Sequence, residues 1–188
     1  MAHLTYEELE AGLAHIREAP RNGGTLDLIV ARPEREVREV LDVATLDLEK
    51  GLLGDNWLSR GSSSMPDGAA DPEKQLNVMN ARASALVAAD PDRRQLAGDQ
   101  LHLDIDLSHE NLPAGAQLEI GEAVIEITAE PHTGCGKFRA RFGADALRFV
   151  NSPVGQALRL RGACAKVVVP GEIRRGDRVI VRRQPPTA

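Results

Sequence analysis

Cysteine is scarce in this chain, and the scarcity excludes several classes of protein. Cys135 and Cys164 are the only two cysteines among 188 residues, too few for a disulfide framework. No second cysteine pair accompanies His132 and Cys135, so we do not expect a structural zinc site. The N-terminus also lacks a cationic stretch followed by an apolar one, as in a signal peptide. We therefore expect a cytoplasmic protein whose thiols are reduced.

Aromatic residues, excess positive charge and long apolar runs are lacking as well. Aromatics make up 3% of the chain, whereas single-stranded nucleic acids bind to proteins by stacking on aromatic side chains. A formal net charge of -5 gives no basic field for nucleic-acid binding. No apolar run approaches the length of a membrane span. We expect neither nucleic acid nor a membrane as a partner.

What the sequence does contain is a series of short apolar runs, several of them alternating with polar residues, separated by glycine and proline turns. Such runs predict β-strands, and the stretch from Val37 to Leu48 predicts one long strand. The runs are 26–30, 37–48, 75–79, 101–105, 117–120, 124–130, 163–169 and 179–181. Many short strands with few helices predict a mainly β fold, an antiparallel β-barrel with a few peripheral helices.

Helices are predicted at a few places between these strands. Thr5 and Glu8 form a capping-box pattern that predicts a helix to about Ala19. Asn80 can cap a helix that runs through Ala89. The stretch 137–142 can form a helical turn, and 145–150 predicts a further helix. We accordingly expect an N-terminal helical extension over residues 1–24 and a barrel domain over residues 25–188.

One loop carries the candidate chemistry. It is Glu130-Pro131-His132-Thr133-Gly134-Cys135-Gly136-Lys137-Phe138, after a predicted strand and before a predicted helical turn. Glycines on both sides leave Cys135 unobstructed and permit unusual backbone geometry. Basic neighbours favour the thiolate, which binds soft metals and attacks sulfur or carbon. The alternative is an inert buried cysteine. Cys164, inside an apolar run, is predicted to be a core thiol without a chemical role.

Two other segments have structural and functional interpretations. Gly51 to Trp57 predicts a tight turn in which Asp55 accepts hydrogen bonds from backbone amides. The stretch 59–72 is rich in Gly, Ser, Pro, Asp and Ala, which predicts a loop, either a solvated one or a lid over a site.

Four segments follow one another in an order typical of one family. They are Gly51-Leu52-Leu53-Gly54-Asp55, the run 75–80, the signature from Asp99 through Thr128, and Pro131-His132-Thr133-Gly134-Cys135. In this order they resemble the MOSC domain, the module named for the C-terminal part of molybdenum-cofactor sulfurases. The resemblance covers about residues 26–183 and is to a stand-alone bacterial type of MOSC protein. It implies a barrel of mostly antiparallel strands, similar to the pyruvate-kinase barrel.

The chain departs from the family pattern at three places. Gly54-Asp55-Asn56-Trp57 stands where the family has G-D-R-H. Arg94-Gln95-Leu96 and Gly98-Asp99-Gln100 replace its Arg-Asn-Ile/Val and G-E-N segments. These differences concern contacts with substrate and cofactor rather than the fold.

The resemblance implies that Cys135 carries sulfur or ligates molybdenum in a pterin-dithiolene cofactor. A thiolate suits molybdenum that dithiolene sulfurs already hold. His132 could then orient or protonate a bound oxygen, or be a hydrogen-bonded loop histidine. Thr133 could bind the cofactor or cap the next turn. The basic candidates for the cofactor's phosphate, each of which could instead be a solvated surface charge, are Arg94, Lys137, Arg139 and Arg141.

Three functions fit this resemblance. The first is a molybdenum-dependent oxidoreductase that reduces N-hydroxylated small molecules with electrons from a separate reductase. The second is a carrier that holds a persulfide on Cys135 or passes the cofactor on, with a sulfurase as partner. The third is a non-catalytic binding module. Pyridoxal phosphate is not expected, because its binding domain is not recognisable in this sequence.

Overall fold

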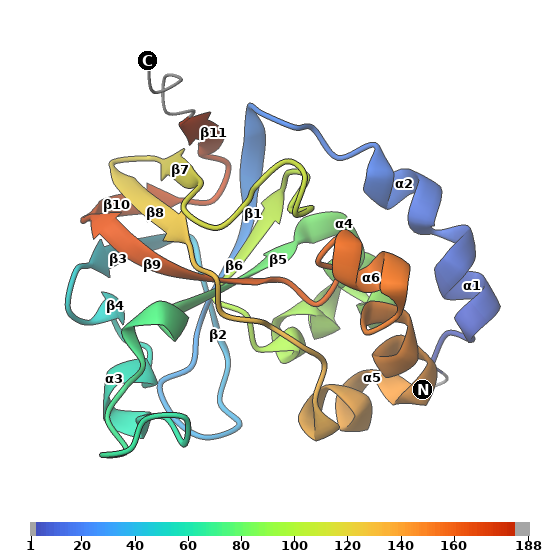
Figure 1. Cartoon of the computed structure of the whole chain (residues 1–188), viewed down its shortest axis with the longest axis horizontal. Coiled ribbons are helices and arrows are strands. Elements are labelled where there is room, and N and C mark those ends of the chain that lie inside the picture. The colour runs from blue at the N-terminus through green and yellow to red at the C-terminus, as the bar shows by residue number, and fades with distance from the viewer. Residues whose placement is uncertain (1–2, 183–188) are drawn as a thin grey trace.

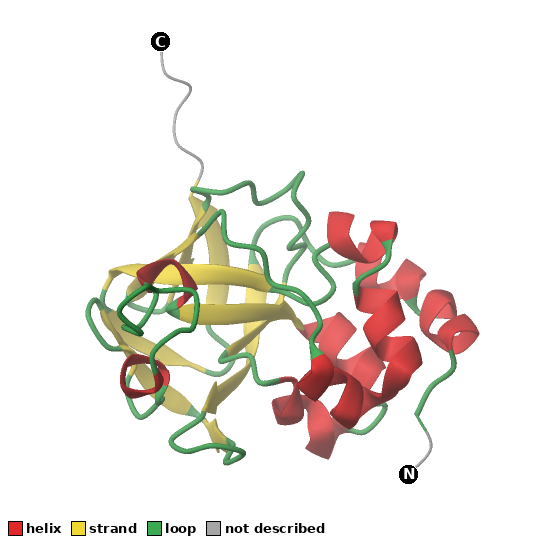
Figure 2. Ribbon diagram, turned by 60° about the horizontal axis from the view of Figure 1, so that its bottom comes forward, coloured by secondary structure: helices red, strands yellow, loops and turns green. Residues whose placement is uncertain are grey.

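The computed structural model describes residues 3–182, and it has two parts. Figures 1 and 2 show a β-barrel on one side and most of the helices gathered against it on the other. Helices and strands each take 29% of the chain. The prediction of a β-barrel with helices around it is confirmed, but helix takes as large a share as strand, so the fold is not mainly β.

Within the described residues, seven strands close the barrel, and an eighth, β2 (Glu39–Leu41), adds to its rim. Their order around the barrel is β1 (Gly24–Ala31), β6 (Leu101–Asp104), β5 (Leu76–Asn80), β9 (Ala163–Val169), β8 (Ala123–Ile127), β7 (Gln117–Ile120) and β11 (Arg178–Arg182). The ring closes where Gly24 and Thr25 pair with Val179 and Arg178. The strands expected at 26–30, 75–79, 101–105, 117–120, 163–169 and 179–181 are all present.

The barrel is mixed, which corrects the expectation of a purely antiparallel one. β5 and β6 run parallel, with Val78 opposite Leu101 and Asn80 opposite Leu103. Parallel neighbours need a crossover connection rather than a hairpin. Here α4 (Ala81–Ala88) and the 3-10 helix η2 (Pro91–Ala97) carry the chain back to the same end of the sheet. The Asn80 side chain caps α4 as expected, accepting a hydrogen bond from the Ala83 amide.

The single long strand expected over residues 37–48 is divided in two. β2 pairs with β1, whereas β3 (Val43–Asp47) joins a separate sheet with β4 (Gly51–Leu52) and β10 (Gly171–Arg174). The chain changes partner at Asp42, whose carbonyl accepts a hydrogen bond from the Arg175 amide. The alternation of apolar and polar residues continues across this point. It shows which face of a strand is buried, but it does not show which strand lies beside it, so the sequence does not reveal the division.

Two hydrophobic clusters correspond to the two parts of the fold. The barrel interior is filled by inward-facing aliphatic residues such as Leu26, Leu101, Leu103 and Ile125. The second cluster lies between the barrel and the helices and contains the phenylalanines of α5 (Gly136–Val150). The other helical segments are α1 (Tyr6–Ala11), α2 (Leu13–Arg17), α6 (Pro153–Ala157), α3 (Trp57–Arg60) and the 3-10 helix η1 (Pro72–Lys74).

The N-terminal helix packs on this second cluster. Thr5 and Glu8 form the expected capping box, but the helix is divided at Gly12 into α1 and α2. Leu9 and Ile16 are buried in the helical cluster, so the segment is part of the folded body. Residues 1–2 and 183–188 of the two expected domains lie outside the described residues. Within residues 3–182, no helix has the length and apolar character that crossing a membrane requires.

Candidate functional site

The cysteine loop connects β8 to α5. Cys135 is the N-cap residue of α5, its backbone is extended, and its side chain is exposed. The Gly134 amide donates to Asn151 Oδ1 at 2.9 Å, which ties the loop to the far end of α5. A Cβ atom at Gly134 would lie 2.6 Å from Leu147. A larger residue at 134 would have to displace the end of the Leu147 side chain, so glycine is favoured here by close packing and not by an unusual backbone angle. The loop therefore presents an accessible thiol on a fixed backbone.

A buried ion-pair network holds the histidine of this loop. Arg161 Nη1 lies 2.7 Å and 2.9 Å from the two carboxylate oxygens of Asp99, and His132 Nε2 lies 2.9 Å from Asp99 Oδ1. Asp99 is fully buried, and Arg161 is 7% exposed. The three residues come from three separate segments, so the network ties the loop to η2's end and to the start of β9. His132 is held in one orientation by this network.

The electrostatics of the network determine the protonation of His132. Burial would raise the pKa of Asp99, but Arg161 and His132 together hold that pKa well below its usual range. The pKa of His132 is lowered by burial and by Arg161, against the opposing effect of Asp99. His132 is therefore neutral near pH 7. Because the Asp99 carboxylate can only accept, His132 Nε2 carries the proton and Nδ1 remains an acceptor.

A second buried ion pair fixes the Gly51–Trp57 turn. Arg32 donates to both carboxylate oxygens of Asp55, through Nε at 2.7 Å and Nη2 at 2.9 Å. The backbone amides of Arg32 and Trp57 also donate to Asp55, at 3.0 Å and 2.9 Å. The predicted role of Asp55 as an acceptor of backbone hydrogen bonds is thus confirmed. Arg32 Nη1 reaches the Gly98 carbonyl, which links this turn to the segment that carries Asp99.

Three adjoining hollows surround the cysteine loop. The loop hollow, of about 240 Å³, is lined by His109, His132, Thr133, Arg159 and Arg161 among others. The thiol hollow, of about 160 Å³, is lined by Trp57, Arg60, Lys74, Asn77, His132 and Cys164 among others. The arginine hollow, of about 280 Å³, is lined by Arg32, Arg35, Arg38, Asn56, Arg60 and Lys137 together with two glutamates.

Shared residues make these hollows neighbours. His132 lines both the loop hollow and the thiol hollow, and Arg60 lines both the thiol hollow and the arginine hollow. Small-molecule sites span roughly 300–1,000 Å³, so each hollow alone is small for an organic cofactor, whereas the three volumes together fall within this range. Cys135 lines none of the three. It lies beside them in the chain, between His132 and Lys137.

The structure brings some of the predicted site residues to these hollows and not others. Thr133 lines the loop hollow and Lys137 the arginine hollow. Arg141 pairs with Glu36 and donates to the Leu96 carbonyl at 2.8 Å, and Arg139 is exposed on α5. Arg94 is directed elsewhere, because its guanidinium pairs with Asp27 and donates to the Ser84 hydroxyl.

Sequence reasoning missed several residues of this site. Asp99, Arg161, Arg60 and Lys74 were not predicted as site residues, although Asp99 lies in one of the segments that carry the family resemblance and Arg161 lies within the residues that it covers. The ion pair of Asp99 with Arg161 spans 62 positions, and no local pattern reveals such a pairing. Cys164 is 2% exposed and lines the thiol hollow, where burial raises its pKa to about 12. It is a neutral thiol.

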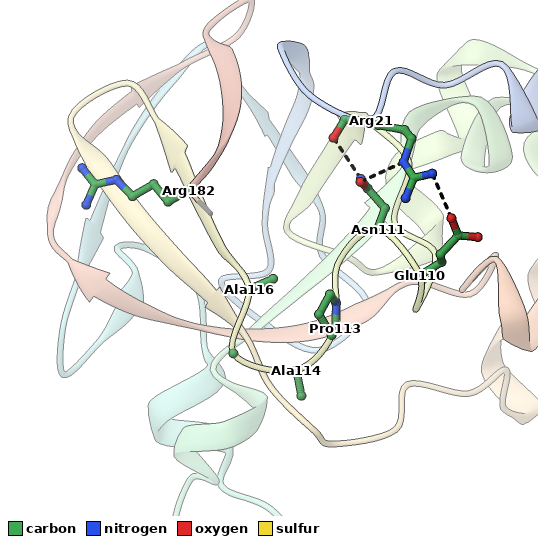
Figure 3. Close-up of a pocket in the computed structure, with 8 residues that line it drawn as sticks. Arg21, Glu110, Asn111, Pro113, Ala114, Ala116 and Arg182 are labelled. Carbon is green, nitrogen blue, oxygen red and sulfur yellow. Dashed lines mark hydrogen bonds and ion pairs between the residues drawn. The ribbon is translucent and has the colours of Figure 1, made fainter. Parts of the chain in front are cut away.

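A further cavity, of about 470 Å³, lies away from this chemistry (Figure 3). Arg21 donates there to Glu110 at 2.9 Å and to Asn111 Oδ1 at 3.3 Å. Arg182 on the opposite wall pairs with Glu119. These polar groups satisfy one another, and the cavity shares no lining residue with the three hollows. Within residues 3–182, no group of three or more His, Cys, Asp or Glu side chains could hold a metal ion.

Comparison with known families assigns this site a context. The model of the MOSC domain matches residues 67–180, well over half of the chain. The chain belongs to the MOSC domain family. MOSC domains are associated with molybdenum-cofactor binding or sulfurase-like function. The MOSC match includes the cysteine loop, Asp99 and Arg161, but it begins after β1 and β4, so the barrel extends beyond the matched segment.

Solved structures share the fold of this MOSC protein. The YUAD protein from Bacillus subtilis aligns with a TM-score of 0.63 and 14% identity, covering 86% of this chain and 97% of that one. YiiM from Escherichia coli aligns with a TM-score of 0.55 and 18% identity, covering 86% and 71%. YiiM from Geobacillus stearothermophilus aligns with a TM-score of 0.59 and 11% identity, covering 85% and 75%. No protein with a curated description matches the sequence significantly.

Proposed function

We propose that this MOSC protein binds a molybdenum–pterin dithiolene cofactor through Cys135 and reduces N-hydroxylated small molecules, with electrons from a separate reductase. The observation that carries the proposal is the exposed Cys135 thiol in a loop whose residues His132, Thr133 and Lys137 line three adjoining hollows. A soft metal that already has dithiolene ligands needs only one thiolate from the protein. The family match supports the cofactor, and the substrate class is our proposal.

The residues around the loop fit such a group. Arg161 is buried, and its Nε atom has no hydrogen-bond partner among the described residues although the residue lines the loop hollow. A buried donor without a partner is costly, and the acceptor atoms of a pterin ring would satisfy it. The Thr133 side chain in the same wall can donate or accept. When bound, the cofactor would supply a metal centre that passes electrons from the separate reductase to the substrate and takes up its oxygen.

The chain's own groups would bind the substrate and handle protons. Reduction of N–OH to N–H takes up two electrons and two protons and releases water. Neutral His132 faces two hollows, and its Nδ1 atom can accept a hydrogen bond from the substrate hydroxyl and take part in proton transfer. Asp99 and Arg161 keep the ring in one tautomer and orientation. In the thiol hollow, Lys74 pairs with Asp71 and Glu130, so it would orient a polar substrate as a fixed positive charge rather than give up a proton.

The test is the molybdenum and pterin content of protein purified from a host that makes the cofactor and from one that does not. We expect near-stoichiometric molybdenum and pterin from the competent host and loss of molybdenum in Cys135→Ser. The matched control is Cys164→Ala, which removes the buried thiol and should keep the metal.

Folded wild-type protein that contains neither molybdenum nor pterin after exposure to the cofactor would refute the proposal. Labile sulfur on Cys135 in that protein would indicate a persulfide carrier, and its absence would leave the binding module. Retention of molybdenum in Cys135→Ser would refute the assigned ligand while preserving the cofactor.

A further inference from the structure

The arginine hollow carries more positive charge than its own carboxylates neutralise. Five cationic side chains and two glutamates line it. Arg32 is committed to Asp55, and Lys137 lies 3.8 Å from Glu36. Among the residues that the structure describes, Arg35, Arg38 and Arg60 form no ion pair with a carboxylate. The chain as a whole has a net charge of -5, so the excess of positive charge in this hollow is local and opposite in sign to the charge of the protein.

Two side chains of the arginine hollow also carry buried polar atoms without partners. Arg38 Nε and Asn56 Oδ1 are buried and have no hydrogen-bond partner in the described part of the chain, and both residues line the arginine hollow. Rotation of the Asn56 amide by 180° exchanges its oxygen and nitrogen, so the same position can present an N–H donor. The pKa of Arg38 is lowered by burial and by repulsion from Arg141 and Arg32, and the pKa of Arg60 by burial and by Arg32.

Glu36 occupies part of this cationic surface. Its backbone has a positive φ of 65°, which is uncommon for a residue other than glycine. That conformation places the carboxylate beside Arg141 and Lys137, and Glu36 is one of the two acidic groups of the hollow. An anion that entered the hollow would compete with Glu36 for these cations.

We propose that the arginine hollow is a binding site for a phosphate monoester dianion and that Glu36 is its internal competitor. Guanidinium groups match phosphate oxygens in geometry, and a dianion would neutralise the charges of Arg35, Arg38 and Arg60. A volume of about 280 Å³ admits a phosphate group with part of the molecule that carries it.

Two molecules could carry that phosphate. Arg60 connects the arginine hollow to the thiol hollow, and Lys137 is two residues from Cys135, so the terminal phosphate of the pterin cofactor is one source. This assignment rests on the proposed function. A phosphorylated substrate is the other source. Phosphate binding by the hollow itself does not depend on molybdenum.

The experiment is calorimetric titration of cofactor-free protein with inorganic phosphate at low ionic strength. We expect saturable binding that Arg38→Gln weakens by about tenfold or more, because a charge-assisted hydrogen bond is lost. Glu36→Gln should strengthen it by about fivefold, because one competing charge is removed. The control Arg148→Gln removes a cation of α5 that does not line the arginine hollow; its side chain is 64% exposed, and the affinity should be unchanged.

Absence of saturable binding in folded wild-type protein would overturn the proposal, and so would equal effects of Arg38→Gln and Arg148→Gln. Circular dichroism and thermal unfolding establish that each variant is folded. Weaker binding in Glu36→Gln would refute the role of Glu36 as a competitor.

A second titration uses protein loaded with cofactor. Loss of phosphate binding there identifies the cofactor's phosphate as the occupant, and retained binding identifies a phosphorylated substrate. If the protein takes up no molybdenum but still shows the pattern of the variants, the proposed function has failed and the phosphate site stands.

Discussion

His102 should make the stability of this protein fall steeply as the pH drops below 7. The residue lies in β6 between Leu101 and Leu103, which fill the barrel, so its ring faces the helical layer. It is 0% exposed, and neither ring nitrogen has a hydrogen-bond partner in the described residues. Burial therefore lowers its pKa to about 4. The charged groups that act on it are Asp99 and Asp27, which raise the pKa, and Arg94 and Arg161, which lower it.

The magnitude follows from the difference between the folded and unfolded states. An unfolded histidine titrates near pH 6.5, so below that pH the unfolded chain takes up a proton that the folded protein refuses down to about pH 4. The contribution is fully present above pH 6.5 and is lost as the pH falls. Linkage gives a loss of about 2 kcal/mol between pH 7 and pH 5, approaching about 3 kcal/mol below pH 4.

The perturbation that isolates this effect is His102→Leu, which has no titrating group at the site. The free energy of unfolding of both proteins is measured in urea at pH 7, 6 and 5, and between pH 7 and pH 5 the wild type should lose about 2 kcal/mol more than the variant, whichever is the more stable at pH 7. Other titrating groups are common to both proteins and largely cancel in the difference. His15→Gln, with a side chain 69% exposed, controls for the loss of a histidine and should leave the difference constant. Parallel pH profiles for wild type and His102→Leu would refute the reasoning.

Three further outcomes are expected. Asp99→Asn should lower the free energy of unfolding by about 3–5 kcal/mol in urea denaturation, because it leaves the Arg161 charge buried and uncompensated. Thr5→Ala should lower it by about 1 kcal/mol, since the Thr5 hydroxyl and the Glu8 carboxylate cap α1 reciprocally. Iodoacetamide at pH 8 should modify exposed Cys135 and spare Cys164, which is 2% exposed with a pKa raised to about 12, and mass spectrometry of the intact protein would then show one adduct.

Each of these has a matched comparison. Asp145→Asn removes a carboxylate that is 45% exposed and should cost little, so an equal effect of Asp99→Asn would contradict the importance of the buried pair. Thr133→Ala removes a threonine hydroxyl in an exposed loop position without affecting α1. The folded Cys135→Ser protein should carry no adduct. An adduct on it would show that Cys164 is accessible.

The sequence alone determined most of the elements and the identity of the central loop. Alternation in the strands and the capping patterns at Thr5 and Asn80 are local properties, because they depend on neighbours within a few residues. The resemblance carried by the glycine turns and by Cys135 led to the MOSC family, and the match over residues 67–180 confirms it. The choice of Asp55 as a backbone acceptor also followed from its place in a turn.

The tertiary structure decided what depends on segments distant in the sequence. The parallel pairing of β5 with β6 follows from where α4 and η2 return the chain, and the division of residues 37–48 follows from which strands are adjacent. Asp99 became the centre of the site only when Arg161 and His132 were placed around it. Arg38 likewise became a candidate anion ligand only when the fold placed other cations around it. Burial and charge pairing at such positions are sums over distant neighbours, and a single sequence does not contain those distances.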